Sequence, residues 1–330
     1  MLIGTGKREA AGGTARTAVR GAGVRAAAAV LGGVLLVGVP IAGTAGCGAQ
    51  RTSGDAGDRP REITAAETAL LASAQEELVG RCMERHGFRY WPAAPPTRDE
   101  LREFPYAVDD LGWARRHGYG GDLQREASRY QRTGPNAQYT KGLSADRRRA
   151  YAVTRTGDGT RAVEVTAPNG VDIRQNRTGC LAQAQGRLYG DFREWFRLST
   201  VVTNLPDHSG KIRRTALYGN AVEAWSACMK EKGHTYGSPS GLQTALEKAA
   251  DGATPREAHR IEVRLATAEA ACARSTPLSA TVRTLEKHYA EADRAQYGAD
   301  IDAHRRMQLS ALQRARHLVQ GSTQNAAHGK

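Results

Sequence analysis

The sequence predicts a mainly α protein with two related helical halves, each stapled by one disulfide, and a loop-rich insertion that carries a small β-hairpin. Three observations indicate this fold class. A nine-residue motif occurs twice, four cysteines remain to pair after the first one, and apolar residues recur at helical spacing over most of the chain beyond residue 62. One alternating segment predicts the hairpin, because alternation of apolar and polar residues is typical of a half-buried strand.

The first 46 residues have the features of a secretory signal. Residues 1–25 carry five basic residues against one acid, and residues 26–46 carry no charge and have an apolar centre. A positive segment followed by an apolar segment and then small residues directs a chain to export. The sequence therefore predicts a signal peptide over residues 1–46, with the rest of the chain delivered outside the cytoplasm.

The segment 42–48, Ala-Gly-Thr-Ala-Gly-Cys-Gly, resembles a bacterial lipobox, in which the cysteine is acylated and becomes the mature N-terminus. Thr44 departs from that motif, which usually has Leu or another aliphatic residue there. We expect lipidation of Cys47. Two alternatives stay open: soluble secretion after cleavage near Ala45, and an uncleaved anchor, since about 20 apolar residues can span a bilayer. The polar residues 47–62 are predicted to be a flexible tether, and the expected location is the outer face of the cytoplasmic membrane or the cell wall.

The repeated motif covers residues 82–90 and 228–236, which share Cys, Met, Gly and Tyr at identical offsets. Each copy is predicted to end an amphipathic helix, because Gly87 and Gly233 stand where a left-handed residue stops a helix.

A capping box of Thr64 and Glu67 predicts the start of the first of these helices. Its apolar face is expected to comprise Leu71, Ala74, Leu78 and Cys82.

Five cysteines are present, and lipidation of Cys47 would leave an even number to pair. We expect the pairs Cys82–Cys180 and Cys228–Cys272, although two other pairings are not excluded by the sequence. The spacings Cys82-x3-His86 and Cys228-x5-His234 could each be half of a metal site. No second close pair accompanies either one, and an exported protein meets oxidising conditions. The sequence therefore predicts no metal site and no cofactor.

The expected organisation is a first repeat over 63–205, interrupted by an insertion at about 92–176, and a second repeat over 206–320. Within the insertion, residues 161–167 alternate like a strand, 168–170 read Pro-Asn-Gly, and 171–174 can return. Further helices are predicted over 181–205, over 211–232, from Thr254 to Cys272, and from Thr276 to about Val319. The tail from 321 to 330 is expected to be disordered.

These patterns resemble a group of uncharacterised actinobacterial exported lipoproteins. The similarity rests on Trp-x-x-Cys-Met-x3-Gly-x2-Tyr and on a later helix carrying Glu262, Ala266, Glu269 and Cys272, with a first-half counterpart at 179–190. It covers about residues 63–300. The resemblance implies an envelope location and paired cysteines, and it implies no activity.

Charge and motifs limit the classes of function. From Cys47 onward, 42 Lys and Arg stand against 33 Asp and Glu, a net charge of about +9. Export removes nucleic acid as a partner, so the anionic partners expected are lipid headgroups or wall polymers. The chain has no nucleophile elbow, zinc-protease motif or phosphate-binding loop after the signal. The acids Asp109, Asp110 and Asp122 of the insertion give the alternative of an envelope hydrolase.

Aromatic residues concentrate between residues 88 and 119, in a chain otherwise poor in them. We expect a ligand groove formed by Tyr90, Trp91, Trp113 and Tyr119, or else a small core that covers the insertion. The expected function is that of a non-catalytic envelope lipoprotein that binds a wall component or a partner protein. The further alternative is an accessory lipoprotein of a membrane transporter.

Overall fold

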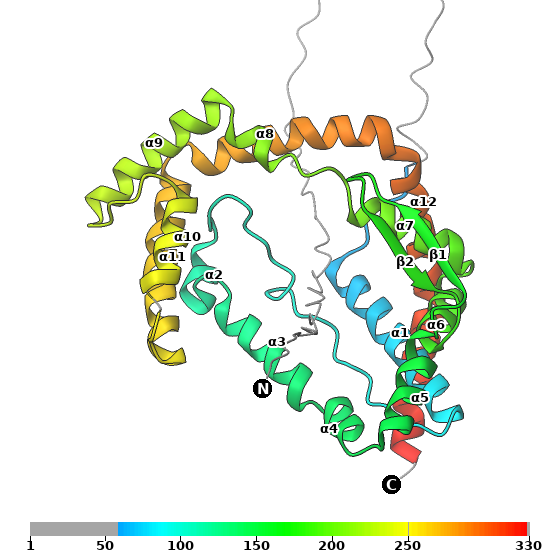
Figure 1. Cartoon of the computed structure of the whole chain (residues 1–330). Coiled ribbons are helices and arrows are strands. Elements are labelled where there is room, and N and C mark those ends of the chain that lie inside the picture. The colour runs from blue at the N-terminus through cyan, green and yellow to red at the C-terminus, as the bar shows by residue number, and fades with distance from the viewer. Residues whose placement is uncertain (1–58, 250, 329–330) are drawn as a thin grey trace, which may run out of the picture.

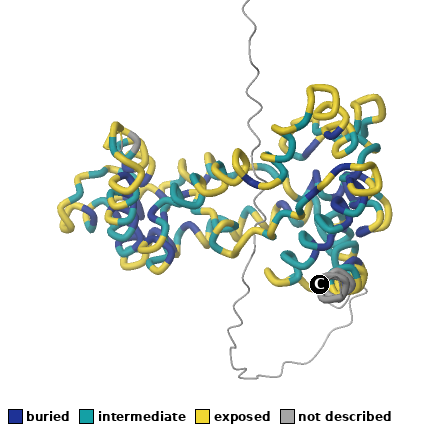
Figure 2. Tube along the Cα trace, turned by 90° about the horizontal axis from the view of Figure 1, so that it is seen from below, coloured by how far each residue is buried: buried dark blue, intermediate teal, exposed yellow. Residues whose placement is uncertain are grey.

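The computed structural model describes residues 59–249 and 251–328. The predicted signal peptide, Cys47 and the tether up to residue 58 lie outside the described residues. The described chain forms two helical lobes joined by slimmer segments (Figures 1 and 2). The first lobe contains α1 (Ala65–Arg85), α4 (Pro135–Lys141), α5 (Ala145–Thr156), β1 (Ala162–Thr166), β2 (Asp172–Asn176), α6 (Cys180–Tyr189) and α7 (Phe192–Thr203). The second lobe contains α2 (Leu111–His117), α9 (Ala216–Glu231), α10 (Pro239–Ala249) and α11 (Pro255–Ser275). Between the lobes run α3 (Gly121–Thr133), α8 (Ser209–Arg213) and α12 (Leu278–His328).

Over residues 59–249 and 251–328 the fold is mainly α with one antiparallel hairpin and two disulfides, as predicted. The hairpin pairs Ala162 with Asn176 and Thr166 with Asp172. The Pro-Asn-Gly turn closes it through a hydrogen bond from Ala167 N to Val171 O of 2.9 Å.

The two copies of the repeated motif end their helices in the same way. Gly87 follows α1 with φ +75°, and Gly233 follows α9 with φ +82°. Phe88 N donates to Met83 O at 3.0 Å, and His234 N donates to Met229 O at 2.9 Å. This bond across the last turn satisfies a carbonyl that has no partner within the helix. The predicted helix ends are therefore confirmed.

The helix starts follow from capping. Thr64 begins α1 and Thr254 begins α11, each in a reciprocal capping box with the Glu three residues later. The buried face of α1 includes the four predicted residues, Leu71, Ala74, Leu78 and Cys82.

The insertion contains more helix than its composition suggested, because most of its glycines stand at helix ends. Asp110 caps α2 through a bond from Trp113 N of 2.9 Å, and Ser144 caps α5. Gly134 precedes Pro135, the first residue of α4, where a missing N–H costs no helical hydrogen bond. A glycine at a helix end also divides the expected helix at 181–205 into α6 and α7. Gly190 follows α6, and the Asp191 side chain caps the start of α7.

The prediction of two sequential halves needs correction, because α12 belongs to both lobes. Its first turns bury Leu278 and Val282 in the second core, whereas Ala311, Leu312 and Ala315 are buried in the first core beside α1. Conversely, α2 of the first half packs against α11. Neither half alone covers its apolar helix faces, so segments of each half complete the core of the other.

Helix α12 bends between its two ends (Figure 1). Arg294 Nη2 lies 2.7 and 2.9 Å from the two carboxylate oxygens of Asp302. Residues eight apart in a straight helix are separated by about 12 Å along the axis. The ion pair therefore braces the bent section.

The expected disordered tail also needs correction, because the helix α12 continues to His328. Gly321 is tolerated inside it at a cost of about 1 kcal/mol relative to Ala.

Aromatic stacking fixes α12 on α7. The Trp195 ring lies 3.4 Å from the Tyr189 ring and 4.7 Å from the His304 ring, both nearly parallel. Burial lowers the pKa of His304 to about 4. The imidazole is consequently neutral at pH 7 and packs here as an aromatic ring.

Candidate functional site

A pocket of about 380 Å³ lies where the chain leaves α1. Gly87 turns the chain back, so that the next four residues form the pocket wall. Asn136 of α4 holds this segment with two hydrogen bonds, 3.0 Å from Trp91 N and 2.7 Å to Trp91 O. The lining residues are Glu84, Gly87, Phe88, Arg89, Tyr90 and Trp91.

Two arginines are fixed at this pocket by aromatic rings. The Arg89 guanidinium lies 4.9 Å from the centre of the Trp91 ring, and that of Arg147 lies 4.5 Å from the centre of the Phe88 ring. Arg147 also donates to Gly87 O at 3.1 Å. Stacked guanidinium groups keep their charge and their free N–H donors, so Arg89 in the pocket wall and Arg147 beside it can each bind an anionic group. The same wall also contains the carboxylate of Glu84.

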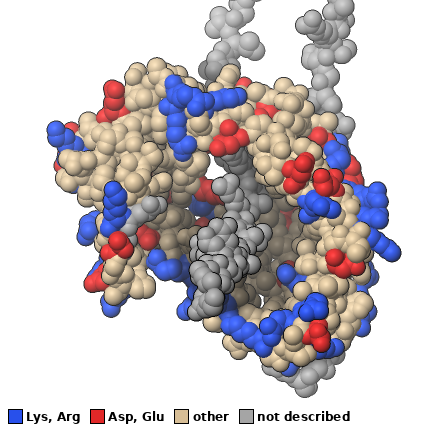
Figure 3. Space-filling view, in the orientation of Figure 1, with Lys and Arg blue, Asp and Glu red and all other residues tan. Residues whose placement is uncertain are grey.

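The pocket adjoins a strongly basic segment, residues 129–161, which covers the end of α3, all of α4 and α5, and the approach to β1. It carries eight Lys and Arg against two acids. Lys and Arg side chains line the edge formed by α3 and α4 in Figure 3. All eight are exposed: Arg129, Arg132, Lys141, Arg147, Arg148, Arg149, Arg155 and Arg161.

The charges of the basic segment are largely uncompensated. In the part of the chain that the structure describes, only Arg129 of the eight has an acidic partner within 4 Å, Glu126 at 3.5 Å. Several others bind backbone carbonyls instead, for example Arg148 to Thr140 O at 3.2 Å. A carbonyl orients a cation without neutralising it, so this surface holds a positive potential.

The four residues of the predicted ligand groove do not come together, which corrects that prediction. Tyr90 and Trp91 belong to the first lobe, whereas Trp113 and Tyr119 pack in the second. Trp113 is 3% exposed and lies 4.8 Å from the Phe104 ring. The alternative of a small core therefore describes Trp113. Proximity in sequence could not reveal that the connecting residues cross from one lobe to the other.

Tyr90 is also mostly buried, and its hydroxyl donates to Glu76 at 2.8 Å. Burial and the nearby Glu76 carboxylate raise the pKa of Tyr90, so the phenol stays protonated. Tyr90 and Trp91 both line the pocket, and of the four predicted residues Trp91 is the one whose ring stacks on the Arg89 guanidinium.

The acids suggested for a hydrolase each have a structural partner. Asp110 caps α2 and accepts from Arg102 at 2.6 Å, and Asp122 lies 2.8 Å from His117 Nδ1. Asp109 lies 3.5 Å from Arg283. None of the three lines the pocket at the end of α1.

Two acids buried in α11, Glu262 and Glu269, were not predicted to be functional residues. Glu269 is 0% exposed, and neither of its carboxylate oxygens has a hydrogen-bond partner among the described residues. Burial raises the pKa of Glu269 to about 8, although the nearby Tyr119 hydroxyl and Val108 backbone favour the charged form. Glu262 lies two turns earlier and is also buried, with Arg125 at 3.4 Å. The sequence offered one signal for them: their helical spacing places both acids on the face of α11 that carries the apolar Leu265.

Both predicted disulfides are present, Cys82–Cys180 and Cys228–Cys272. Their second cysteines are not equivalent in the fold, because Cys180 is the first residue of α6 and Cys272 lies in the last turn of α11. Disulfides form and persist in oxidising compartments. Across the described residues, no helix has the length and apolar character needed to cross a membrane.

Comparisons with protein-family models, with curated proteins and with solved structures found no match to this chain.

Proposed function

We propose that this chain is an exported lipoprotein without catalytic activity that binds an anionic polymer of the cell wall. The observation that carries this proposal is the basic segment 129–161, with eight exposed cations of which one has an acidic partner among the described residues. A surface of one sign attracts a polyanion over about a Debye length and needs no deep pocket. The adjoining pocket wall adds Arg89, and the Trp91 ring holds it in place as the Phe88 ring holds Arg147 of the basic segment.

The sequence before residue 59 supports the location. A signal over residues 1–46 would export the chain, and acylation of Cys47 would hold it at the outer face of the membrane. The polar residues between Cys47 and the first lobe would give it reach into the wall.

Substitution of Cys47 by serine tests the anchor. We expect Cys47→Ser to move the protein from the membrane fraction into the medium or the wall fraction, because a serine at this position is not acylated. Intact mass spectrometry of the membrane-extracted wild type should show a diacylglyceryl group on Cys47. An unmodified Cys47 in membrane-extracted protein would contradict the lipid anchor and leave wall binding to be judged separately.

Charge reversal tests the binding surface. In the full chain, Arg147→Glu/Arg148→Glu/Arg149→Glu should weaken cosedimentation with purified wall fragments by about 100-fold, since a basic side chain at an anionic surface contributes about 1 kcal/mol. Binding by the wild type should fall as salt rises.

The matched control reverses three exposed arginines on α11, Arg256, Arg260 and Arg264, and so makes the same change in net charge. This control should bind nearly as well as the wild type. Equal losses for both triple variants would show a nonspecific effect of net charge. Unchanged binding to fragments stripped of their anionic polymer would identify another wall component.

A further inference from the structure

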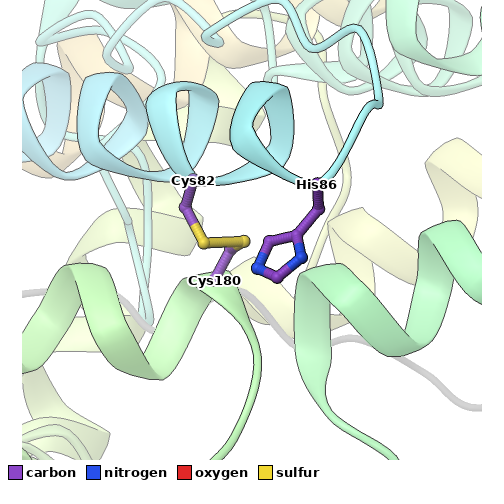
Figure 4. Close-up of side chains that lie close together, drawn as sticks. All are labelled: Cys82, His86 and Cys180. Carbon is purple, nitrogen blue, oxygen red and sulfur yellow. A yellow bond between two sulfur atoms is a disulfide. The ribbon is translucent and has the colours of Figure 1, made fainter.

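The two disulfides differ in what stands beside them. The sulfurs of Cys82 and Cys180 and a ring nitrogen of His86 all lie within 4.8 Å of one another (Figure 4). Within the described ranges, this is the only such group of three His, Cys, Asp or Glu ligand atoms. In the second copy of the motif, Lys232 occupies the position that corresponds to His86.

The fold brings the three residues together from two helices. Cys82 lies in the last turn of α1, and His86 is the residue that caps it, four positions later on the same side. Cys180 begins α6, which packs along α1. In the pattern Cys82-x3-His86 the sequence offered only two ligands, and the fold adds a third from 98 residues away.

Burial distinguishes the roles of these three side chains. Cys82 is 2% exposed and Cys180 is 0% exposed, whereas His86 is exposed. Around the sulfurs, the first core includes Leu78, Met83 and Leu188, which are all buried. This packing would hold the two helices together after the covalent link is opened, so the sulfurs would stay close to each other.

We propose that reduction of Cys82–Cys180 creates a Zn²⁺ site formed by Cys82, Cys180 and His86. A dithiol reductant would break the S–S bond by exchange, becoming a cyclic disulfide itself and giving two electrons and two protons to the cysteines. Each thiol then loses its proton as it binds the metal. Two thiolates and one imidazole are a ligand set that zinc takes at about 2.3 and 2.0–2.1 Å. The fourth position faces solvent on the side of His86. The oxidised chain does not bind zinc, because its sulfurs are not thiolates.

The test measures zinc bound by the full chain in detergent, oxidised or reduced with a phosphine in the absence of oxygen. Equilibrium dialysis against ZnCl2 with metal analysis should give one Zn²⁺ per reduced chain and none per oxidised chain. Co²⁺ in place of zinc should show the thiolate charge-transfer absorption and the visible bands of a tetrahedral site.

Variants distinguish this site from binding by any pair of free thiols. His86→Ala should weaken zinc binding by about tenfold or more, since loss of even an outer partner of a ligand costs about that much. Cys228→Ala/Cys272→Ala should keep the site, and Cys82→Ala/Cys180→Ala should abolish it. Circular dichroism of each reduced sample shows whether its helices persist.

Three results would overturn the proposal. The first is a reduced wild type that binds no zinc, and the second is equal zinc affinity in the wild type and His86→Ala. The third is binding that disappears with Cys228 and Cys272 instead of Cys82 and Cys180. His86→Ala leaves both disulfides intact, so its folding before reduction can be checked independently.

Discussion

Replacing Cys82 and Cys180 by alanine is expected to lower the free energy of unfolding by about 4.7 kcal/mol. The bond closes a loop with a sequence separation of 98 residues, and removing such a loop returns a large conformational entropy to the unfolded chain. Urea unfolding of the full chain, followed by tryptophan fluorescence, measures this loss.

The second disulfide provides the comparison. Cys228–Cys272 has a separation of 44 residues, so its double alanine variant should lose about 4.0 kcal/mol by the same loop entropy. A loss below about 1 kcal/mol for either pair would mean that this disulfide restricts the unfolded chain too little, or strains the folded chain too much, to be a structural staple.

Replacing Glu269 by glutamine is expected to stabilise the protein increasingly as the pH rises. The folded pKa of about 8 lies above the ordinary 4.5. The unfolded chain therefore releases its proton first, and the wild type loses stability as pH rises from about 4.5 through 8. From pH 5 to pH 7.5 this loss amounts to about 3 kcal/mol. Glutamine has no proton to release, so the difference between the two proteins should grow by that amount.

Denaturant unfolding of both proteins at pH 5 and pH 7.5 measures this difference. The same change at Glu223, an exposed carboxylate on α9, is the matched control. A constant difference between wild type and Glu269→Gln at both pH values would mean that Glu269 is already charged in the folded protein.

The local elements could be predicted because their causes are local. A capping box at Thr64, a left-handed glycine at 87 and a cysteine on the buried face each act within a few residues. The pairing of the cysteines also followed from the repeat, although the sequence left alternatives open. The sharing of α12 between the two lobes could not be predicted, because it depends on contacts between residues far apart in the chain.

The candidate site likewise has features that could be predicted from the sequence and features that could not. The aromatic cluster of 88–119 was visible in the sequence, but its separation into two lobes depends on the path of the chain between Trp91 and Trp113. The basic character was visible as net charge. The scarcity of acidic partners for the cations of the basic segment, among the described residues, became evident only from the ion-pair distances. Helical spacing could place Glu269 on the apolar face of α11, but spacing does not show that its carboxylate lacks a hydrogen-bond partner among the described residues.

The path of α12 sets an order of events for the newly made chain. Ala311, Leu312 and Ala315 belong to the first core with Leu71 of α1, so that core cannot close until residues 311–315 have been delivered. If the chain is exported as proposed, it must remain unfolded while it passes through a narrow secretion channel. Completion of the first core would meet that requirement, because it waits for a segment more than 200 residues after α1.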